Sequence, residues 1–225
     1  MQKLLDGLGI KTSNSALYVR ALTHPSYANE HHLDDKHLER LEFMGDAVLQ
    51  LMVSDLIYKE YSDKHTEGEM SLIRSKLVRA DALANEAKKL HLDEYLKLGA
   101  GEEKSNGRNS KNILADAFES FMAAIYLDQG FDFAFKIVTS IFESEVKAID
   151  VSSLLDYKSK LQELIQADKG AVTYREVSHS GTSNDPTYVF EVVLDGDVVL
   201  ASGTGKSKKA AQQDAARKAL EKCSK

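Results

Sequence analysis

The stretch HLERLEFMGDAVLQ, residues 37–50, decides the interpretation of the first part of the chain. Placed on a helix at about 100° per residue, its carboxylates Glu39, Glu42 and Asp46 share an arc of about 60°. Apolar residues cover most of the remaining circumference. We therefore expect a long helix over residues 36–61 that is mostly buried and carries one acidic stripe.

Like charges crowded on a buried stripe repel one another and lose hydration, so their pKa values shift or they hold a cation. Oxygen ligands of this kind suit Mg²⁺, Mn²⁺ or Ca²⁺. Gly45 lies inside the predicted helix, where glycine costs about 1 kcal/mol relative to alanine, and it indicates the close approach of another part of the molecule. This stretch alone leaves open a solvated acidic edge that is paired with lysines or arginines.

A second acidic pair lies in SKNILADAFESFMAAIYL, residues 110–127, which predicts an amphipathic helix with a wide apolar face. Asp116 and Glu119 are three residues apart and are therefore neighbours on its surface. Periodicity does not place this pair opposite the first acidic stripe. By itself, an acidic pair on such a helix is more often solvated surface.

The chain changes character near residue 149, from helical periodicity to strand-like alternation. Asp195-Gly196 is a strong signal for a hairpin turn. We predict an all-α domain over residues 1–148, a linker over 149–155 and an α+β domain with the order α-β-β-β-α over 156–225. Further helices are expected at 67–77, 80–90, 131–148, 157–167 and 207–222, strands at 172–179, 187–194 and 198–202, and a polar loop at 99–108.

Composition separates an acidic body from a basic end. The 225 residues carry a net charge of −6. From Val198 onward, seven basic and two acidic residues give +5, which leaves −11 for the rest.

The one cysteine, Cys223, excludes an intrachain disulfide and favours a reducing compartment, so we expect a cytoplasmic protein. No run approaches the roughly 18 apolar residues of a membrane span, and the N-terminus has no apolar run typical of a signal peptide.

The basic end begins with Lys206, Lys208 and Lys209 at the predicted start of the last helix. Cations at a helix N-terminus oppose the helix dipole. A phosphate partner resolves this conflict, because both the dipole and the lysines attract it. The alternative is an exposed basic helix start that serves solubility.

These stretches together resemble the ribonuclease III family. Residues 39–49, ERLEFMGDAVL, resemble its signature, and residues 114–119, LADAFE, resemble its second acidic motif. The segments EGEMS at 67–71 and LTHPSY at 22–27 also resemble family stretches. The C-terminal element order, with GKSKKAAQ at 205–212, resembles a double-stranded RNA-binding domain. The resemblance covers nearly the whole chain.

The resemblance implies an endoribonuclease that hydrolyses double-stranded RNA to 5′-phosphate and 3′-hydroxyl staggered ends, in ribosomal RNA precursor and messenger RNA processing. It implies Mg²⁺ as cofactor, with Mn²⁺ as a substitute. The implied metal ligands are Glu42, Asp46, Asp116 and Glu119, of which Asp46 and Glu119 are the catalytic pair.

The resemblance also implies supporting residues and a partner subunit. Glu39 and Glu67 would support cleavage near the metal ligands. A homodimer supplies one site for each strand, and Phe43 is expected to insert into the partner. Simple core packing is the alternative for Phe43. The family stretch around His24 is expected to serve packing rather than catalysis.

For the C-terminal domain, the resemblance implies contacts along one face of an A-form duplex. Gln162 and Gln166 would face one minor groove, and the three lysines would span the intervening phosphates. The loop 180–186 would reach a second minor groove through Asn184. It departs from the common Gly-Pro-x-His pattern, since Gly181 is followed by Thr-Ser-Asn. A non-catalytic duplex-binding protein is the competing hypothesis, which the intact acidic set disfavours.

Overall fold

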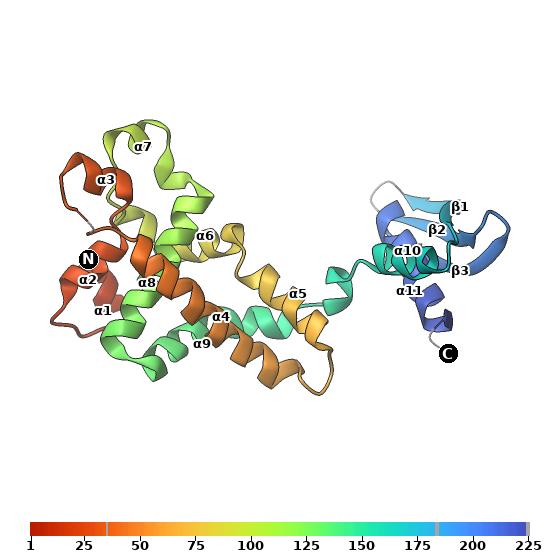
Figure 1. Cartoon of the computed structure of the whole chain (residues 1–225), viewed down its shortest axis with the longest axis horizontal. Helices are drawn as coiled ribbons and strands as arrows, with labels where there is room; N and C mark the ends of the chain where they lie inside the picture. The colour runs from red at the N-terminus through yellow and green to blue at the C-terminus, as the bar shows by residue number, and fades with distance from the viewer. Residues whose placement is uncertain (35, 183–184, 224–225) are drawn as a thin grey trace. The chain divides into compact units, whose positions relative to one another are not determined.

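The chain forms two compact units, which divide between Leu154 and Leu155 (Figure 1). The computed structural model describes residues 1–34, 36–182 and 185–223. Within that part of the chain, no helix is both long and apolar enough to cross a membrane. Val151, from the predicted linker, is buried in the core of the first unit. The domain and linker boundaries given above stay a prediction.

The first unit is built from helices, which confirms the all-α prediction. Helix α8 lies at its centre, with α2, α4, α6 and α9 packed against it (Figure 1). The α-helices are α1 (Gln2–Gly7), α2 (Ser15–Ala21), α3 (Pro25–Glu30), α4 (Glu39–Tyr61), α5 (Glu67–Leu77), α6 (Ala80–Lys89), α7 (Ala100–Lys104), α8 (Lys111–Gln129) and α9 (Phe131–Ala148). The 3₁₀ turns are η1 (Leu92–Glu94), η2 (Gly107–Asn109) and η3 (Val151–Leu154).

The prediction of a continuous loop over residues 99–108 is wrong, because α7 forms within it. Both carboxylate oxygens of Glu30 accept the backbone N–H of Ala100 at 2.9 Å. A carboxylate at a helix N-terminus satisfies a free N–H group and complements the dipole. This cap comes from 70 residues away in the chain, so local sequence patterns do not reveal it.

Helix α4 is not buried on all sides, which corrects the expectation of a mostly buried helix. Phe43, Leu51 and Tyr58 are 80%, 59% and 63% exposed. Their spacing of seven or eight residues places them on one stripe of the helix. The helices α5, α8 and α9 contact other sides of α4. Helical periodicity predicted correctly that apolar residues occur around most of α4. It does not predict which of these residues are covered by other helices of the same chain.

At Gly45, the backbones of α4 and α8 approach each other closely. A Cβ atom at this position would overlap the backbone carbonyl of Glu119. The absence of a side chain lets the two helix backbones approach, which confirms the close approach expected from the sequence. The acidic residues that flank Gly45 on α4 are therefore brought to the turn of α8 that contains Glu119.

Replacing Gly45 with alanine is expected to lower the free energy of unfolding by about 1–3 kcal/mol, because the added methyl group must push two backbones apart. Gly68→Ala in α5 is the control, since a Cβ there meets nothing within 4 Å and alanine favours helix by up to about 1 kcal/mol. Urea unfolding of both variants measures the difference. Equal stability of the two variants would contradict the crossing described here.

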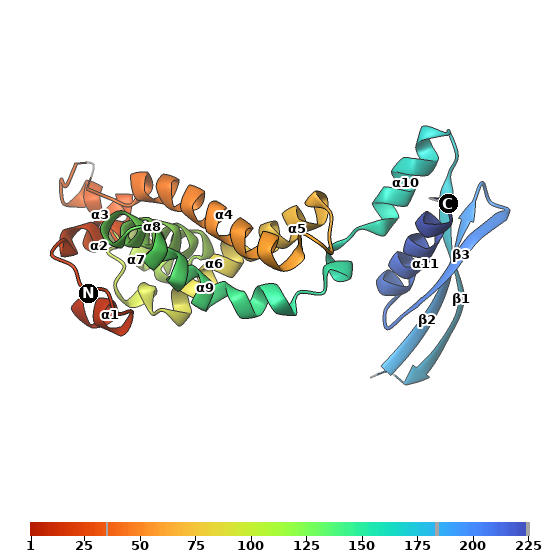
Figure 2. The same cartoon turned by 90° about the horizontal axis from the view of Figure 1, so that it is seen from below.

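The second unit has the predicted order α-β-β-β-α, which confirms its fold class. Strands β1 (Val172–Thr182), β2 (Asp185–Leu194) and β3 (Val198–Gly205) form an antiparallel sheet in the order β1-β2-β3. Helices α10 (Tyr157–Ala167) and α11 (Lys208–Cys223) lie on one face of it (Figure 2).

Two local features shape this unit. The predicted hairpin turn is present, with positive φ angles of 49° at Asp195 and 86° at Gly196, as a type I′ turn requires. On β3, a Cβ at Gly203 would overlap the backbone of Ala215 in α11. This close packing buries a small core, to which α11 contributes three alanines. Its members are Leu161, Val192, Ala201, Ala215, Ala216 and Ala219.

Candidate metal centre

Three carboxylates converge where α4 crosses α8. Glu42 comes from α4, and Asp116 and Glu119 come from successive turns of α8. Each offers an oxygen atom within 4.8 Å of the others, and all three side chains are half-buried. No lysine or arginine in the described ranges forms an ion pair with any of them. Among the described residues, the group therefore concentrates negative charge without a lysine or arginine partner.

Burial and mutual repulsion of these carboxylates disfavour their ionised forms, and their pKa values are raised accordingly. Burial raises the pKa of Glu119 to about 8, and the charges of Asp46, Asp116 and Glu42 add to the effect. Burial also raises the pKa of Glu42, as do the charges of Asp116 and Glu39. A divalent cation would restore the ionised form of such groups. The donor set, oxygen atoms only, is the one that Mg²⁺ and Mn²⁺ prefer.

Asp46 lies one turn after Glu42 on α4, at the exposed edge of the group. It is not among the three carboxylates that lie within 4.8 Å of one another. Its Oδ1 atom accepts a hydrogen bond from the Gln50 side chain at 3.3 Å. Among the neighbouring charges, however, Asp46 makes the largest contribution to the raised pKa of Glu119. The structure thus brings three of the four expected ligands together and leaves the fourth close by.

The two residues expected to support cleavage differ in position. Glu39 is exposed in the first turn of α4, 3.6 Å from the Nδ1 atom of His37, and its charge acts on Glu42. Glu67 begins α5 and accepts a hydrogen bond from Ser71 at 2.9 Å. Glu67 is not part of the group of three carboxylates.

Comparison with known proteins identifies the family of this chain. A family model described as Ribonuclease-III-like matches residues 14–145, and the Double-stranded RNA binding motif matches residues 157–223. Ribonuclease 3 of Streptococcus thermophilus is 44% identical over 222 residues, which cover 98% of this chain and 96% of that protein. This chain belongs to the ribonuclease III family. The family inferred from the sequence motifs is thereby confirmed.

Other ribonuclease III family members extend the comparison. Ribonuclease 3 of Streptococcus gordonii is 42% identical over 221 residues, covering 97% of this chain and 94% of that protein. A solved nuclease domain of ribonuclease III from Campylobacter jejuni is 34% identical, with a TM-score of 0.59, and covers 64% of this chain and 96% of that domain. That domain is described as structurally flexible in a region involved in dimer formation.

His24 has a connection to the acidic group that the sequence motifs did not predict. It caps α3, where its Nδ1 atom accepts the backbone N–H of Ser26 at 3.2 Å. Its backbone N–H donates to the carbonyl of Lys97 at 3.0 Å. Burial raises the pKa of Asp116, and the nearby His24 lowers it. The motif LTHPSY was the signal in the sequence, but only the fold places it beside α8.

The predicted RNA-binding side chains lie on the surface of the second unit. Gln162 and Gln166 are exposed on α10. Lys206 and Lys208 are exposed but paired, with Asp185 at 2.6 Å and with Glu176 at 2.8 Å. The remaining predicted residues are Lys209, which is exposed, and Asn184, which lies outside the described residues.

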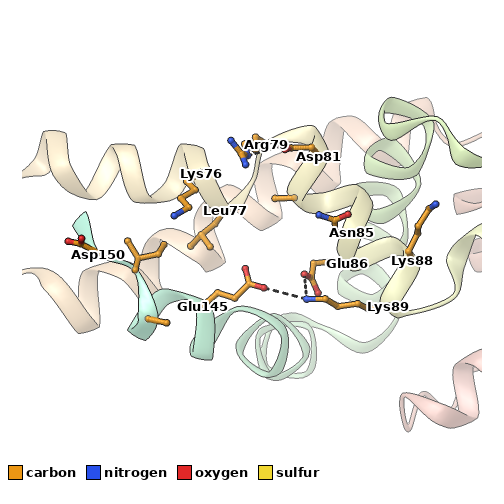
Figure 3. A pocket seen from close by; sticks show the side chains of 13 residues that line it. Lys76, Leu77, Arg79, Asp81, Asn85, Glu86, Lys88, Lys89, Glu145 and Asp150 are labelled. Atoms are coloured by element: carbon orange, nitrogen blue, oxygen red, sulfur yellow. Dashed lines mark hydrogen bonds and ion pairs between the residues drawn. The ribbon is translucent and has the colours of Figure 1, made fainter. Parts of the chain in front are cut away.

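A hollow of about 940 Å³ between α5, α6 and the end of α9 has a different character (Figure 3). Lys89 lies between two carboxylates there, 2.6 Å from Glu86 and 3.4 Å from Glu145. Lys76, Arg79 and Lys88 also line this hollow, so its acidic groups have basic neighbours, unlike those at the crossing of α4 and α8. The hollow lacks the unpaired acidic character of a divalent-cation site.

The raised pKa of Glu119 predicts how stability depends on pH in protein freed of divalent ions. Between the ordinary value of 4.5 and about 8, the folded state holds a proton that the unfolded state has lost. The free energy of unfolding should therefore fall as pH rises through this window. In the Glu119→Gln variant, the free energy of unfolding should decrease less over this pH range. Saturating Mg²⁺ should oppose the same decrease in the unchanged protein.

Urea unfolding in EDTA at several pH values measures this dependence. Glu94→Gln is the matched control, because Glu94 is 65% exposed and pairs with His91. If Glu119→Gln and Glu94→Gln show the same pH dependence as the unchanged protein, Glu119 does not titrate as described.

Proposed function

We propose that this protein is a metal-dependent endoribonuclease that cleaves double-stranded RNA. The observation that carries the proposal is the group Glu42, Asp116 and Glu119 in a member of the ribonuclease III family. Its crowded carboxyl groups have no lysine or arginine partner within the described part of the chain. A unit that matches a double-stranded RNA binding motif follows in the same chain. The acidic group supplies a reaction centre, and the second unit supplies affinity for the substrate.

The carboxylates would hold Mg²⁺, with Mn²⁺ as a substitute. Bound divalent ions supply an activated water and stabilise charge on the phosphoryl and leaving oxygens. Glu42, Asp116 and Glu119 would bind them from the buried side. Asp46 would complete the ligand set from the exposed edge, and Glu39 and Glu67 would support it. We propose Asp46 and Glu119 as the catalytic pair and 5′-phosphate and 3′-hydroxyl ends as the products.

The exposed apolar stripe of α4 supports a homodimer as the active form. Helix α4, which also carries Glu42 and Asp46, exposes three large apolar side chains along one stripe: Phe43, Leu51 and Tyr58. A two-fold interface over this stripe would place two equivalent sites in one assembly. Each site would cut one strand, which yields staggered ends. Phe43, the most exposed of the three, is the side chain we expect to insert into the partner.

The second unit would hold the duplex by its backbone rather than by its sequence. Gln162, Gln166 and Asn184 would contact minor-groove hydroxyls, and the lysines at the start of α11 would contact phosphates. Such recognition suits structured RNA in general. We propose ribosomal RNA precursors and structured messenger RNA as substrates in the cytoplasm.

Glu119→Gln separates cutting from binding. Removing one metal-binding charge should cost several kcal/mol of transition-state stabilisation, which corresponds to about 100-fold or more in rate. Affinity for duplex RNA should remain, because the second unit is unchanged. Single-turnover cleavage of a labelled duplex with Mg²⁺ and a gel-shift assay in EDTA measure the two properties. Unimpaired cleavage by this variant, or no cleavage by the unchanged protein, would overturn the proposed function.

Phe43→Asp should weaken the proposed dimer. Loss of a buried aromatic side chain at an interface costs about 2 kcal/mol or more, or roughly a 30-fold rise in the dissociation constant. Analytical ultracentrifugation across a concentration series measures it. Leu127→Asp is the control, since Leu127 is 52% exposed at the end of α8 and off the stripe. The same association state for both variants would show that the stripe is not the interface.

A further inference from the structure

Two of the three lysines at the start of α11 already have carboxylate partners within the free protein. The Nζ atom of Lys208 lies 2.8 Å from the Glu176 carboxylate, and that of Lys206 lies 2.6 Å from Asp185. The conflict between these cations and the helix dipole is thus resolved internally, by carboxylates in place of phosphates. An RNA phosphate that binds Lys208 must displace Glu176.

The chain holds Glu176 in place through a bulge in β1. The pairing with β2 shifts between Glu176, opposite Phe190, and Ser178, opposite Val189. In a regular strand, residues 176 and 179 would point to opposite faces, but the extra residue returns them to the same face. His179 Nδ1 consequently lies 3.3 Å from the Glu176 carboxylate.

Tyr188 on β2 completes this arrangement. Its ring stacks against that of His179 with centroids 6.0 Å apart, and the Lys208 Nζ atom lies 5.9 Å from its centre. Glu176, His179, Tyr188 and Lys208 thus form one connected cluster from two strands and a helix, which we call the Glu176 cluster. Lys208 and His179 lower the pKa of Glu176, so its carboxylate is ionised at neutral pH.

Glu176 is also less exposed than the lysine it contacts. Its side chain is 30% exposed, against 62% for Lys208, while Asp185 beside Lys206 is 72% exposed. A carboxylate restrained by two partners loses less conformational freedom on pairing than a free surface carboxylate. The Glu176–Lys208 pair is therefore the stronger of the two internal competitors for phosphate.

We propose that Glu176 sets the affinity of this protein for duplex RNA by competing with the RNA backbone for Lys208. The inference rests on the proposed function, in which Lys208 contacts phosphate. When RNA binds, a phosphate replaces the Glu176 carboxylate as the partner of Lys208. Part of the attraction between Lys208 and the phosphate therefore only offsets the loss of the Glu176–Lys208 pair. Return of Lys208 to Glu176 also favours dissociation, which would help the enzyme leave its cleaved product.

Glu176→Gln in the full chain tests this inference, since glutamine keeps the shape and removes the charge. Affinity for an RNA duplex of about 20 base pairs, long enough to span such a domain, is measured in EDTA, so that no divalent ion supports cleavage. We expect about two- to five-fold tighter binding at low salt, the worth of one exposed ion pair. The gain should come from slower dissociation and should shrink as salt rises.

Glu191→Gln is the matched control for charge. Glu191 pairs with Arg175 at 2.8 Å, and Arg175 precedes Glu176 in β1, so its side chain leaves the opposite face of the sheet. Both variants change the net charge equally, but only Glu176→Gln releases Lys208. Equal affinities of the two variants would overturn the inference.

Lys208→Ala distinguishes the inference from the function on which it rests. If Lys208→Ala binds RNA as well as the unchanged protein, the proposed role of this lysine in RNA binding fails. If Lys208→Ala weakens binding but Glu176→Gln does not strengthen it, only the competition fails. In the double variant, the gain from Glu176→Gln should disappear, because no lysine remains to be released.

Discussion

The crossing of α4 and α8 at Gly45 is the constraint on which the acidic group depends. A side chain at that position would collide with the backbone of Glu119, so the helices could not approach as they do. Because they do approach, Glu42 is brought within reach of Asp116 and Glu119. Glycine in a helix interior is unfavourable by itself. Here that local cost accompanies an electrostatic cost, since like charges are concentrated at the same crossing.

The core of the first unit makes this electrostatic cost tolerable. Helix α8 is surrounded by other helices, and Phe118, Phe121 and Met122 are fully buried along it. Burial of such side chains contributes about 1.5–3 kcal/mol each. The buried hydroxyl of Ser120 donates to the carbonyl of Ala21 and fixes the turn next to Glu119. The acidic residues are thus held together by packing, not by attraction for one another.

Sequence patterns predicted these features to different degrees. Helical periodicity predicted α4 and its acidic stripe, because i, i+3 and i+4 spacing is a local property. It did not predict that Phe43 and Leu51 lie exposed, since coverage depends on what the rest of this chain brings to α4. Asp116 and Glu119 were assigned through family resemblance, because periodicity fixes where side chains lie on one helix and not which helix lies opposite.

The lysines of α11 show the same limit in the second unit. Their position at a helix N-terminus was apparent from the sequence, and so was the electrostatic conflict that it creates. The pairing of Lys208 with Glu176 was not, because it depends on a bulge that changes the face on which His179 lies.

The two units therefore meet a similar physical problem in different ways. At the crossing of α4 and α8, carboxylates are crowded without a lysine or arginine partner among the described residues, and their raised pKa values reflect this crowding and their burial. At the start of α11, lysines are crowded, but Lys206 and Lys208 each pair with a carboxylate of the same unit. Charged groups that lack a partner in the free protein are stabilised most by an external ion. Charged groups that already have a partner must exchange it for the external one. The first arrangement favours binding of a cation, and the second favours reversible contact with a polyanion, which suits the proposed metal-dependent cleavage of RNA.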